Sequence, residues 1–151
     1  MSIVKLSQWE MMLLEAARAS GFVDEEIIHK LRTDNRAAFA DVEGGRFDFS
    51  DLFELAQQDL LTIETAIREG YQIKFTTING VKFLLNKRYG LTAEADYTVQ
   101  ETALDQIRLK DDALAAVHTT LSPNWRIIEL EKFPTSKETV VRIELAQSLP
   151  Q

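Results

Sequence analysis

The sequence predicts an α+β fold in which an antiparallel sheet of about four strands, formed by two β-hairpins, packs against three to five helices. Three observations lead to this class. Apolar residues recur at three- and four-residue spacing over residues 50–69, which is typical of an amphipathic helix. Residues 71–88 alternate around a glycine turn, as hairpin strands do. Residues 125–133 and 139–146 are rich in β-branched side chains and flank the turn sequence PTSKE.

Length and composition limit the type of protein. A chain of 151 residues with 45% hydrophobic content is long enough for one compact core, so we expect a single domain over residues 1–151. The absence of cysteine excludes disulfides and thiolate metal sites and favours a cytoplasmic location. Glu10 and Glu15 interrupt the early apolar run, and no run approaches the roughly 18 residues that span a bilayer. We therefore expect a soluble, uncleaved protein without membrane contact.

Two helices are expected near the N-terminus. Residues 7–10, SQWE, fit a capping box that starts a first helix, which runs to about Ser20. Gly21 in the left-handed conformation closes this helix. Asp24 caps the second helix, whose first turn is acidic. The apolar stripe of the second helix consists of Ile27, Ile28 and Leu31.

The next segment is followed by the longest predicted helix. Residues 32–45, RTDNRAAFADVEGG, either prolong the second helix or form a separate turn, and two glycines end the segment in both cases. Asp48 or Ser50 caps the long helix, and Gly70 stops it. Its apolar face consists of Leu52, Phe53, Ala56, Leu60, Ile63 and Ile67.

The side-chain pattern assigns a register to the hairpin at residues 71–88. A two-residue turn at Asn79-Gly80 mixes apolar and polar side chains on both faces, whereas a three-residue loop with a bulge pairs Phe75 with Phe83. We predict the second register because it gives one apolar face. That face carries Ile73, Phe75, Phe83 and Leu85, and the other face carries Gln72, Lys74, Thr76, Lys82, Leu84 and Asn86.

Residues 92–121 have a helical composition. Residues 98–101, TVQE, fit another capping box, and Lys110-Asp111-Asp112 interrupts the apolar stripe that follows. The segment is therefore one helix or two, with Asp111 capping the second, and Ser122-Pro123 ends it. In the final hairpin we pair Leu130 with Ile143 and Glu131 with Arg142.

The sequence offers few groups with catalytic or metal-binding potential. It contains no glycine-rich phosphate loop, no nucleophile elbow and no zinc-binding histidine pair. His29 and His118 are far apart, and as metal ligands they need carboxylates such as Asp34 or Asp111. The paired carboxylates lie where helix N-termini favour negative charge. We therefore expect a non-enzymatic protein with no catalytic residue, cofactor or metal.

Basic residues concentrate in one part of an acidic chain. The formal net charge is −7, but residues 68–90 carry five basic groups and one acidic group. A helix ending in IREGY, followed by a strand, a glycine turn, a strand and YGLT, resembles the end of a winged-helix domain over residues 50–92. The resemblance implies a recognition helix, a wing at residues 71–88 and a dimer that binds nucleic acid. The implied recognition helix departs from that pattern, because five carboxylates accompany Arg68 and repel phosphates.

We expect a small cytoplasmic accessory or regulatory protein that acts through protein contact, as a homodimer. The polar hairpin face and the terminal strand 139–146, placed at a sheet edge, are the expected contact surfaces. The candidate contact residues are Lys74, Lys82, Leu84, Lys87 and Arg88. Trp125, at a strand entrance, is a candidate pocket residue. Two alternatives stay open: a winged-helix-like regulator that binds nucleic acid through the hairpin, and a ligand-binding protein or enzyme with a pocket between sheet and helices.

Overall fold

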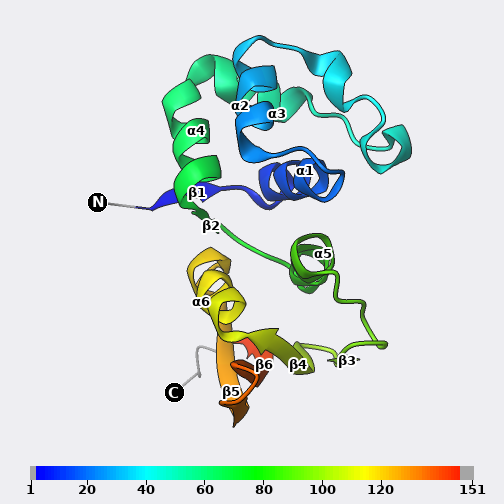
Figure 1. Cartoon of the computed structure of the whole chain (residues 1–151), viewed down its shortest axis with the longest axis vertical. Coiled ribbons are helices and arrows are strands. Elements are labelled where there is room, and N and C mark those ends of the chain that lie inside the picture. The colour runs from blue at the N-terminus through cyan, green and yellow to red at the C-terminus, as the bar shows by residue number, and fades with distance from the viewer. Residues whose placement is uncertain (1–2, 147–151) are drawn as a thin grey trace. The chain divides into compact units, whose positions relative to one another are not determined.

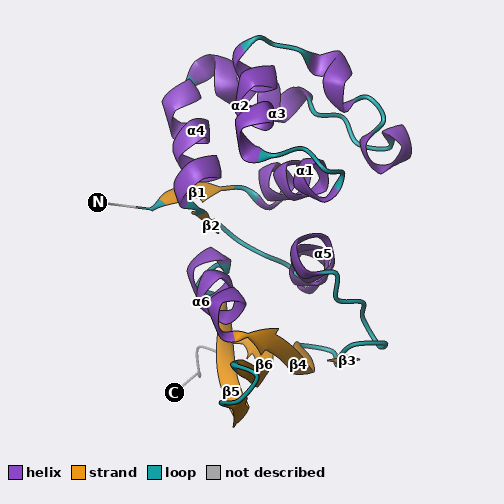
Figure 2. Cartoon of the chain, viewed as in Figure 1, coloured by secondary structure: helices purple, strands orange, loops and turns teal. Residues whose placement is uncertain are grey.

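The computed structural model describes residues 3–146. The chain divides into two compact units, unit 1 at Met1–Lys74 and unit 2 at Phe75–Gln151. Unit 1 combines helices with a small parallel sheet, and unit 2 combines helices with a four-stranded antiparallel sheet (Figure 1, Figure 2). The α+β class is confirmed. The single domain expected over residues 1–151 stays a prediction.

The first two helices begin differently. Helix α1 (Gln8–Ala19) has the predicted capping box: the Ser7 hydroxyl accepts the Glu10 N–H at 3.1 Å, and the Glu10 carboxylate accepts the Ser7 N–H at 2.8 Å. Helix α2 (Asp24–Arg32) begins one residue earlier than predicted, because the Glu26 carboxylate accepts the Val23 N–H at 3.0 Å. Asp24 is therefore not the cap. Its carboxylate accepts a hydrogen bond from Arg18 at 2.9 Å instead.

The segment after α2 does not prolong that helix. It forms two separate turns of 3₁₀ helix, η1 (Arg36–Phe39) and η2 (Val42–Gly45). Phe39 turns inward, where its ring lies 5.0 Å from that of Phe22 and 5.1 Å from that of Phe49. Burial of this ring gives the segment a fixed path without a regular helix.

The prediction of one continuous helix from residue 50 to Gly70 is wrong. The segment consists of α3 (Ser50–Gln58) and α4 (Leu60–Glu69), separated by Asp59 with φ −155° and ψ 77°. The Asp59 carboxylate accepts the Thr62 N–H at 3.2 Å and caps α4. The apolar periodicity runs through both pieces, and only the cap at residue 59 marks the break.

The core of unit 1 lies between its helices and a two-stranded sheet. Strand β1 (Val4–Leu6) pairs in parallel with β2 (Tyr71–Ile73), so the two ends of the unit meet. Gly70, with φ +98°, ends α4 immediately before β2, as predicted. Buried side chains of the core include Leu6, Met11, Leu14, Ile28, Phe53, Ile63, Ile67, Tyr71 and Ile73.

The hairpin predicted at residues 71–88 is wrong. After β2 the chain forms helix α5 (Ile78–Tyr89), which begins where the Thr77 hydroxyl accepts the Gly80 N–H at 3.2 Å. Val81, Leu84 and Leu85 are buried at helical spacing, whereas 61% of Phe75 is exposed. The wing implied by the winged-helix resemblance is therefore replaced by a helix.

The helical prediction for residues 92–121 is wrong for the first half of the segment and right for the second half. Its first half is not a helix: β3 (Thr98–Val99) and β4 (Ala103–Lys110) pair antiparallel. Gln106, with φ +59°, lies in a β-bulge between Leu104 and Ile107. The bulge allows both of these residues to be buried although they are three positions apart, a spacing that is also typical of a helix. The predicted break near residue 110 is confirmed, because α6 (Asp111–Thr120) begins there. Asp111 is not the predicted cap but the first residue of this helix, and its carboxylate accepts the Thr139 hydroxyl instead.

The final hairpin is confirmed, but its register is wrong. Strands β5 (Trp125–Phe133) and β6 (Glu138–Leu145) pair with Ile127 opposite Ile143, three residues from the predicted register. The observed register places Arg126 opposite Glu144 and avoids the repulsion of Glu129 facing Glu144. Helix α6 covers the sheet face that buries Ile107, Leu109, Val141 and Ile143 (Figure 1).

None of the helices in residues 3–146 combines the length and the hydrophobicity that crossing a bilayer requires.

Candidate functional site

The five predicted contact residues do not share a hairpin face. Lys74 is exposed at the end of unit 1, and the other four lie on α5 in unit 2. Leu84 is fully buried, so its predicted position on a solvent-facing surface is wrong. The prediction assumed a strand, in which side chains alternate between two faces, whereas the segment is a helix with about 3.6 residues per turn. A position that faces outward in the strand can therefore face inward in the helix. Whether the four cations contact a partner stays a prediction.

Helix α5 carries the basic character that the sequence places at residues 68–90. Lys82 and Lys87 are half-buried, and the Lys87 ammonium lies 5.7 Å from the centre of the Phe83 ring. The Arg88 guanidinium donates to the Thr120 hydroxyl of α6 at 3.1 Å. Arg88 therefore connects the two helices of unit 2. The helix includes three basic residues and no acidic residue.

Trp125 anchors the start of unit 2. It is 7% exposed, and its indole N–H donates to the Thr76 carbonyl at 2.7 Å. The Asn124 amide donates to the same carbonyl at 2.9 Å, and the Ser122 hydroxyl donates to the Thr76 hydroxyl at 2.8 Å. That Trp125 lines a pocket stays a prediction.

Within residues 3–146, strand β5 forms one edge of the large sheet and the two-residue strand β3 forms the other. The strand order is β3-β4-β6-β5, so the predicted edge at residues 139–146 is wrong because β6 lies between two neighbours. Leu130 is the extra residue of a bulge and is 45% exposed. Glu129 and Lys132 oppose Val141 and Thr139 and so share one face of β5, with 3.6 Å between their charged atoms.

The other face of the sheet is a ladder of ion pairs. Arg108 pairs with Glu138 at 2.9 Å, and Arg142 pairs with Asp105 at 3.3 Å and with Glu144 at 2.7 Å. The hydrogen bonds from Arg108 and Arg142 hold the pKa values of Glu138 and Glu144 below the usual range. Arg126 also pairs with Glu144, so three arginines and three carboxylates of this ladder compensate one another within the sheet.

A groove opens in unit 1 between the start of α1 and the length of α3. We call it the Trp9 groove; its volume is about 290 Å³. Its lining combines one aromatic and one aliphatic side chain with three carboxylates. The lining residues are Ser7, Trp9, Glu10, Asp51, Glu54, Leu55 and Gln58. The Trp9 ring packs edge-to-face against Phe47 at 5.5 Å, which fixes its position beside the groove.

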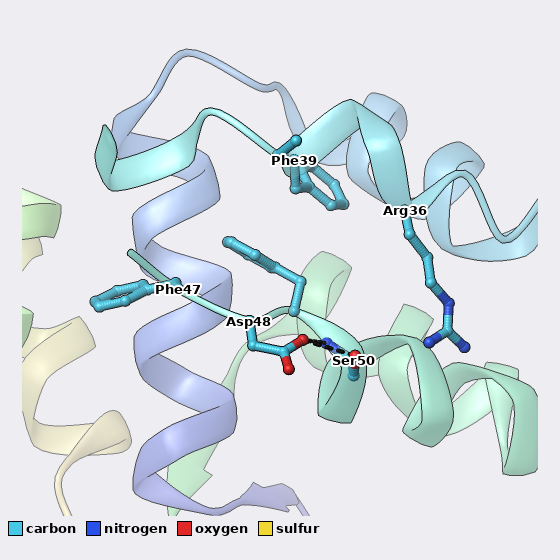
Figure 3. A pocket seen from close by; sticks show the side chains of 7 residues that line it. Arg36, Phe39, Phe47, Asp48 and Ser50 are labelled. Atoms are coloured by element: carbon cyan, nitrogen blue, oxygen red, sulfur yellow. Dashed lines mark hydrogen bonds between the residues drawn. The ribbon is translucent and has the colours of Figure 1, made fainter. Parts of the chain in front are cut away.

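A smaller pocket, which we call the phenylalanine pocket, lies in the same unit. Its volume is about 180 Å³, and Phe47 lines it as well as contacting Trp9. Figure 3 shows Phe39 and Phe47 near the hydrogen-bonded pair of Asp48 and Ser50. The Ser50 hydroxyl and N–H donate to Asp48 at 2.6 and 2.9 Å and hold the pKa of its carboxyl below the usual value.

A third hollow lies in unit 2 at the start of α6. Its volume is about 380 Å³, and its lining includes Lys110, Asp111, Asp112 and Lys137. The Asp111 carboxylate is already engaged, since it accepts the Thr139 hydroxyl at 2.8 Å. Within residues 3–146, no group of three histidine or carboxylate side chains is arranged to hold a metal ion.

Comparison with known proteins finds no match: no family model, no curated protein and no solved structure resembles this chain closely enough to assign a relative.

Sequence reasoning missed the Trp9 groove. One signal was visible, because four of the eight phenylalanines fall within residues 39–53 and indicate an aromatic cluster there. Trp9 is 30 to 44 residues away from these phenylalanines in the sequence. Periodicity along a single helix cannot show that α1 and α3 lie side by side.

Proposed function

We propose that this chain is a small cytoplasmic accessory or regulatory protein that acts through protein contact and pairs with a second copy of itself through β5. The observation that supports this proposal is the edge strand β5, which has nine residues, pairs on one side only within residues 3–146, and carries the exposed Leu130 near its middle. An unpaired edge presents backbone N–H and carbonyl groups to another strand. The cytoplasmic location is supported by the absence of cysteine.

The charges along β5 favour one antiparallel register with a second copy. A twofold axis between Leu130 and Glu131 sets Glu129 opposite the partner's Lys132 and Ile128 opposite the partner's Phe133. Each of these two pairs occurs twice because the axis repeats it. The sheet faces agree, since Glu129 and Lys132 share one face of β5, and Ile128 and Phe133 share the other. Charged residues and a bulge, which usually discourage edge pairing, here select a register.

Light scattering coupled to size exclusion tests the dimer. We expect twice the monomer mass at micromolar concentration, and a Leu130→Glu variant should shift the equilibrium to monomer because it sets a carboxylate opposite Glu131 of the second copy, twice in the dimer. Leu130 is exposed, so the variant should keep its fold, which circular dichroism checks. A wild-type protein that stays monomeric at the highest soluble concentration would exclude self-association.

A charge exchange tests the register. Lys132→Glu should weaken the dimer by at least about tenfold, because two attractive cross-strand pairs become repulsive. The double variant Glu129→Lys, Lys132→Glu restores both pairs with exchanged signs and should recover most of the affinity. Equal weakening in the single and double variants would exclude this register, whereas Leu130→Glu would still test whether β5 is the contact strand.

Helix α5 supports a second candidate function, nucleic-acid binding, because it is basic and has no acidic side chain. In this alternative, Lys82→Glu, Lys87→Glu, both on α5, should weaken retention on DNA or RNA and reduce the slope of affinity against salt by about 2. Retention of this double variant equal to that of the wild type would remove the alternative.

A further inference from the structure

The Trp9 groove lies in unit 1, whereas the proposed dimer strand lies in unit 2. Unit 1 is the acidic part of the chain, with 8 basic and 14 acidic side chains in residues 1–74. A groove on such a surface attracts cationic groups over a distance of about 8–10 Å at physiological salt. The charge of the unit therefore suggests the sign of a ligand, and the lining residues define its shape.

Two carboxylates of the groove are not engaged elsewhere. Ten of the 14 acidic side chains in unit 1 accept an ion pair or a hydrogen bond. Within residues 3–146, the four that make no such contact are Asp41, Asp51, Glu54 and Glu69. Asp51 and Glu54 both line the Trp9 groove, three residues apart on α3. Like charges at this spacing repel each other, and a cation between them relieves the repulsion.

The apolar part of the lining complements the charges. Trp9 and Leu55 are half-buried and line the groove together with Asp51 and Glu54. An indole ring attracts an ammonium or guanidinium group through its π-electrons. The methylene stem of a lysine or arginine side chain can pack along an aliphatic neighbour such as Leu55. One long cationic side chain therefore satisfies both parts of the lining.

The volume of the groove favours one side chain over a whole small molecule. About 290 Å³ lies just below the range of about 300–1,000 Å³ that is typical of small-molecule sites. We propose that the Trp9 groove binds a lysine or arginine side chain from a basic segment of another protein. This contact is additional to the β5 dimer, and a monomeric protein would leave it unaffected.

Fluorine NMR tests the site directly. Protein labelled with 5-fluorotryptophan has one resonance from Trp9 and one from Trp125, and Trp9→Phe assigns them. A synthetic peptide of alternating arginine and glycine should move the Trp9 resonance saturably and leave that of Trp125 in place. A peptide of alternating glutamate and glycine should move neither. A Trp9 resonance that does not respond to the arginine peptide would overturn the proposal.

A matched pair of variants separates the groove from general attraction to an acidic protein. Asp51→Asn, Glu54→Gln should weaken the arginine peptide by about tenfold, because each exposed ion pair contributes up to about fivefold. Asp41→Asn, Glu69→Gln removes the same charge from the two unengaged carboxylates outside the groove and should change affinity less than about twofold. All four side chains are exposed, so both variants should fold. Equal weakening in the two variants would also overturn the proposal.

Discussion

Replacing Arg18 with methionine should lower the free energy of unfolding by about 3–5 kcal/mol, because it breaks the ion pair between Arg18 and the buried Glu15 carboxylate. Arg18 donates to Glu15 at 3.0 Å, to Asp24 at 2.9 Å and to the Ile67 carbonyl at 2.8 Å. Glu15 is 1% exposed and also accepts the Tyr71 hydroxyl at 2.6 Å. This network links α1 to α2, α4 and β2, so its loss affects the whole of unit 1.

Urea unfolding followed by circular dichroism measures this effect. Arg32→Met is the control, because Arg32 pairs with Glu64 at 3.4 Å while half exposed, and an exposed pair contributes at most about 1 kcal/mol. Arg18→Met in a Glu15→Gln background should cost less than in the wild type, since no buried charge is then left behind. Equal losses for Arg18→Met and Arg32→Met would contradict the importance of the buried network.

Replacing Trp125 with alanine should cost about 3–5 kcal/mol, because it removes a large buried ring and leaves a cavity. Trp125→Phe retains most of the apolar volume and removes only the donor to the Thr76 carbonyl, which keeps its hydrogen bond from Asn124. We therefore expect the phenylalanine variant to cost about 1–2 kcal/mol.

Thermal and urea unfolding of the two Trp125 variants distinguish anchoring from pocket formation. A tryptophan that lines an open site can be truncated with little loss of stability, whereas an anchor cannot. Stability of Trp125→Ala close to that of the wild type would contradict the anchoring role. It would instead favour the earlier expectation of a pocket residue.

The hairpin predicted at residues 71–88 shows why a local pattern was insufficient. Ile73, Phe75, Phe83 and Leu85 alternate as strands require, but Val81, Leu84 and Leu85 also recur as a helix requires. Two short patterns therefore competed over the same residues. The Thr77 cap and the burial of Leu84 favour the helix, and burial depends on neighbours that are distant in sequence.

The sheet of unit 2 shows the same limitation. Strands β5 and β6 were predicted because two segments rich in β-branched residues flank a turn sequence. This pattern is local, since it involves only neighbouring residues. Strand β4 was missed because a positive φ at Gln106 shifts the phase of its buried side chains. The edge was also misplaced, since β4 pairs with β6 and this pairing joins residues 28 to 41 positions apart in the sequence.

Local chemistry in the chain was sufficient to predict the capping box of α1, the stop at Gly70, the break before α6, the final pair of strands and the α+β class. These features depend on contacts between residues a few positions apart, and such contacts can be inferred from spacing alone. The tertiary structure decided the conformation of residues 74–110, the register and edge of the sheet, and the meeting of α1 with α3 at Trp9. Those features depend on which distant side chains compete for the same buried space, and a linear pattern does not contain that information.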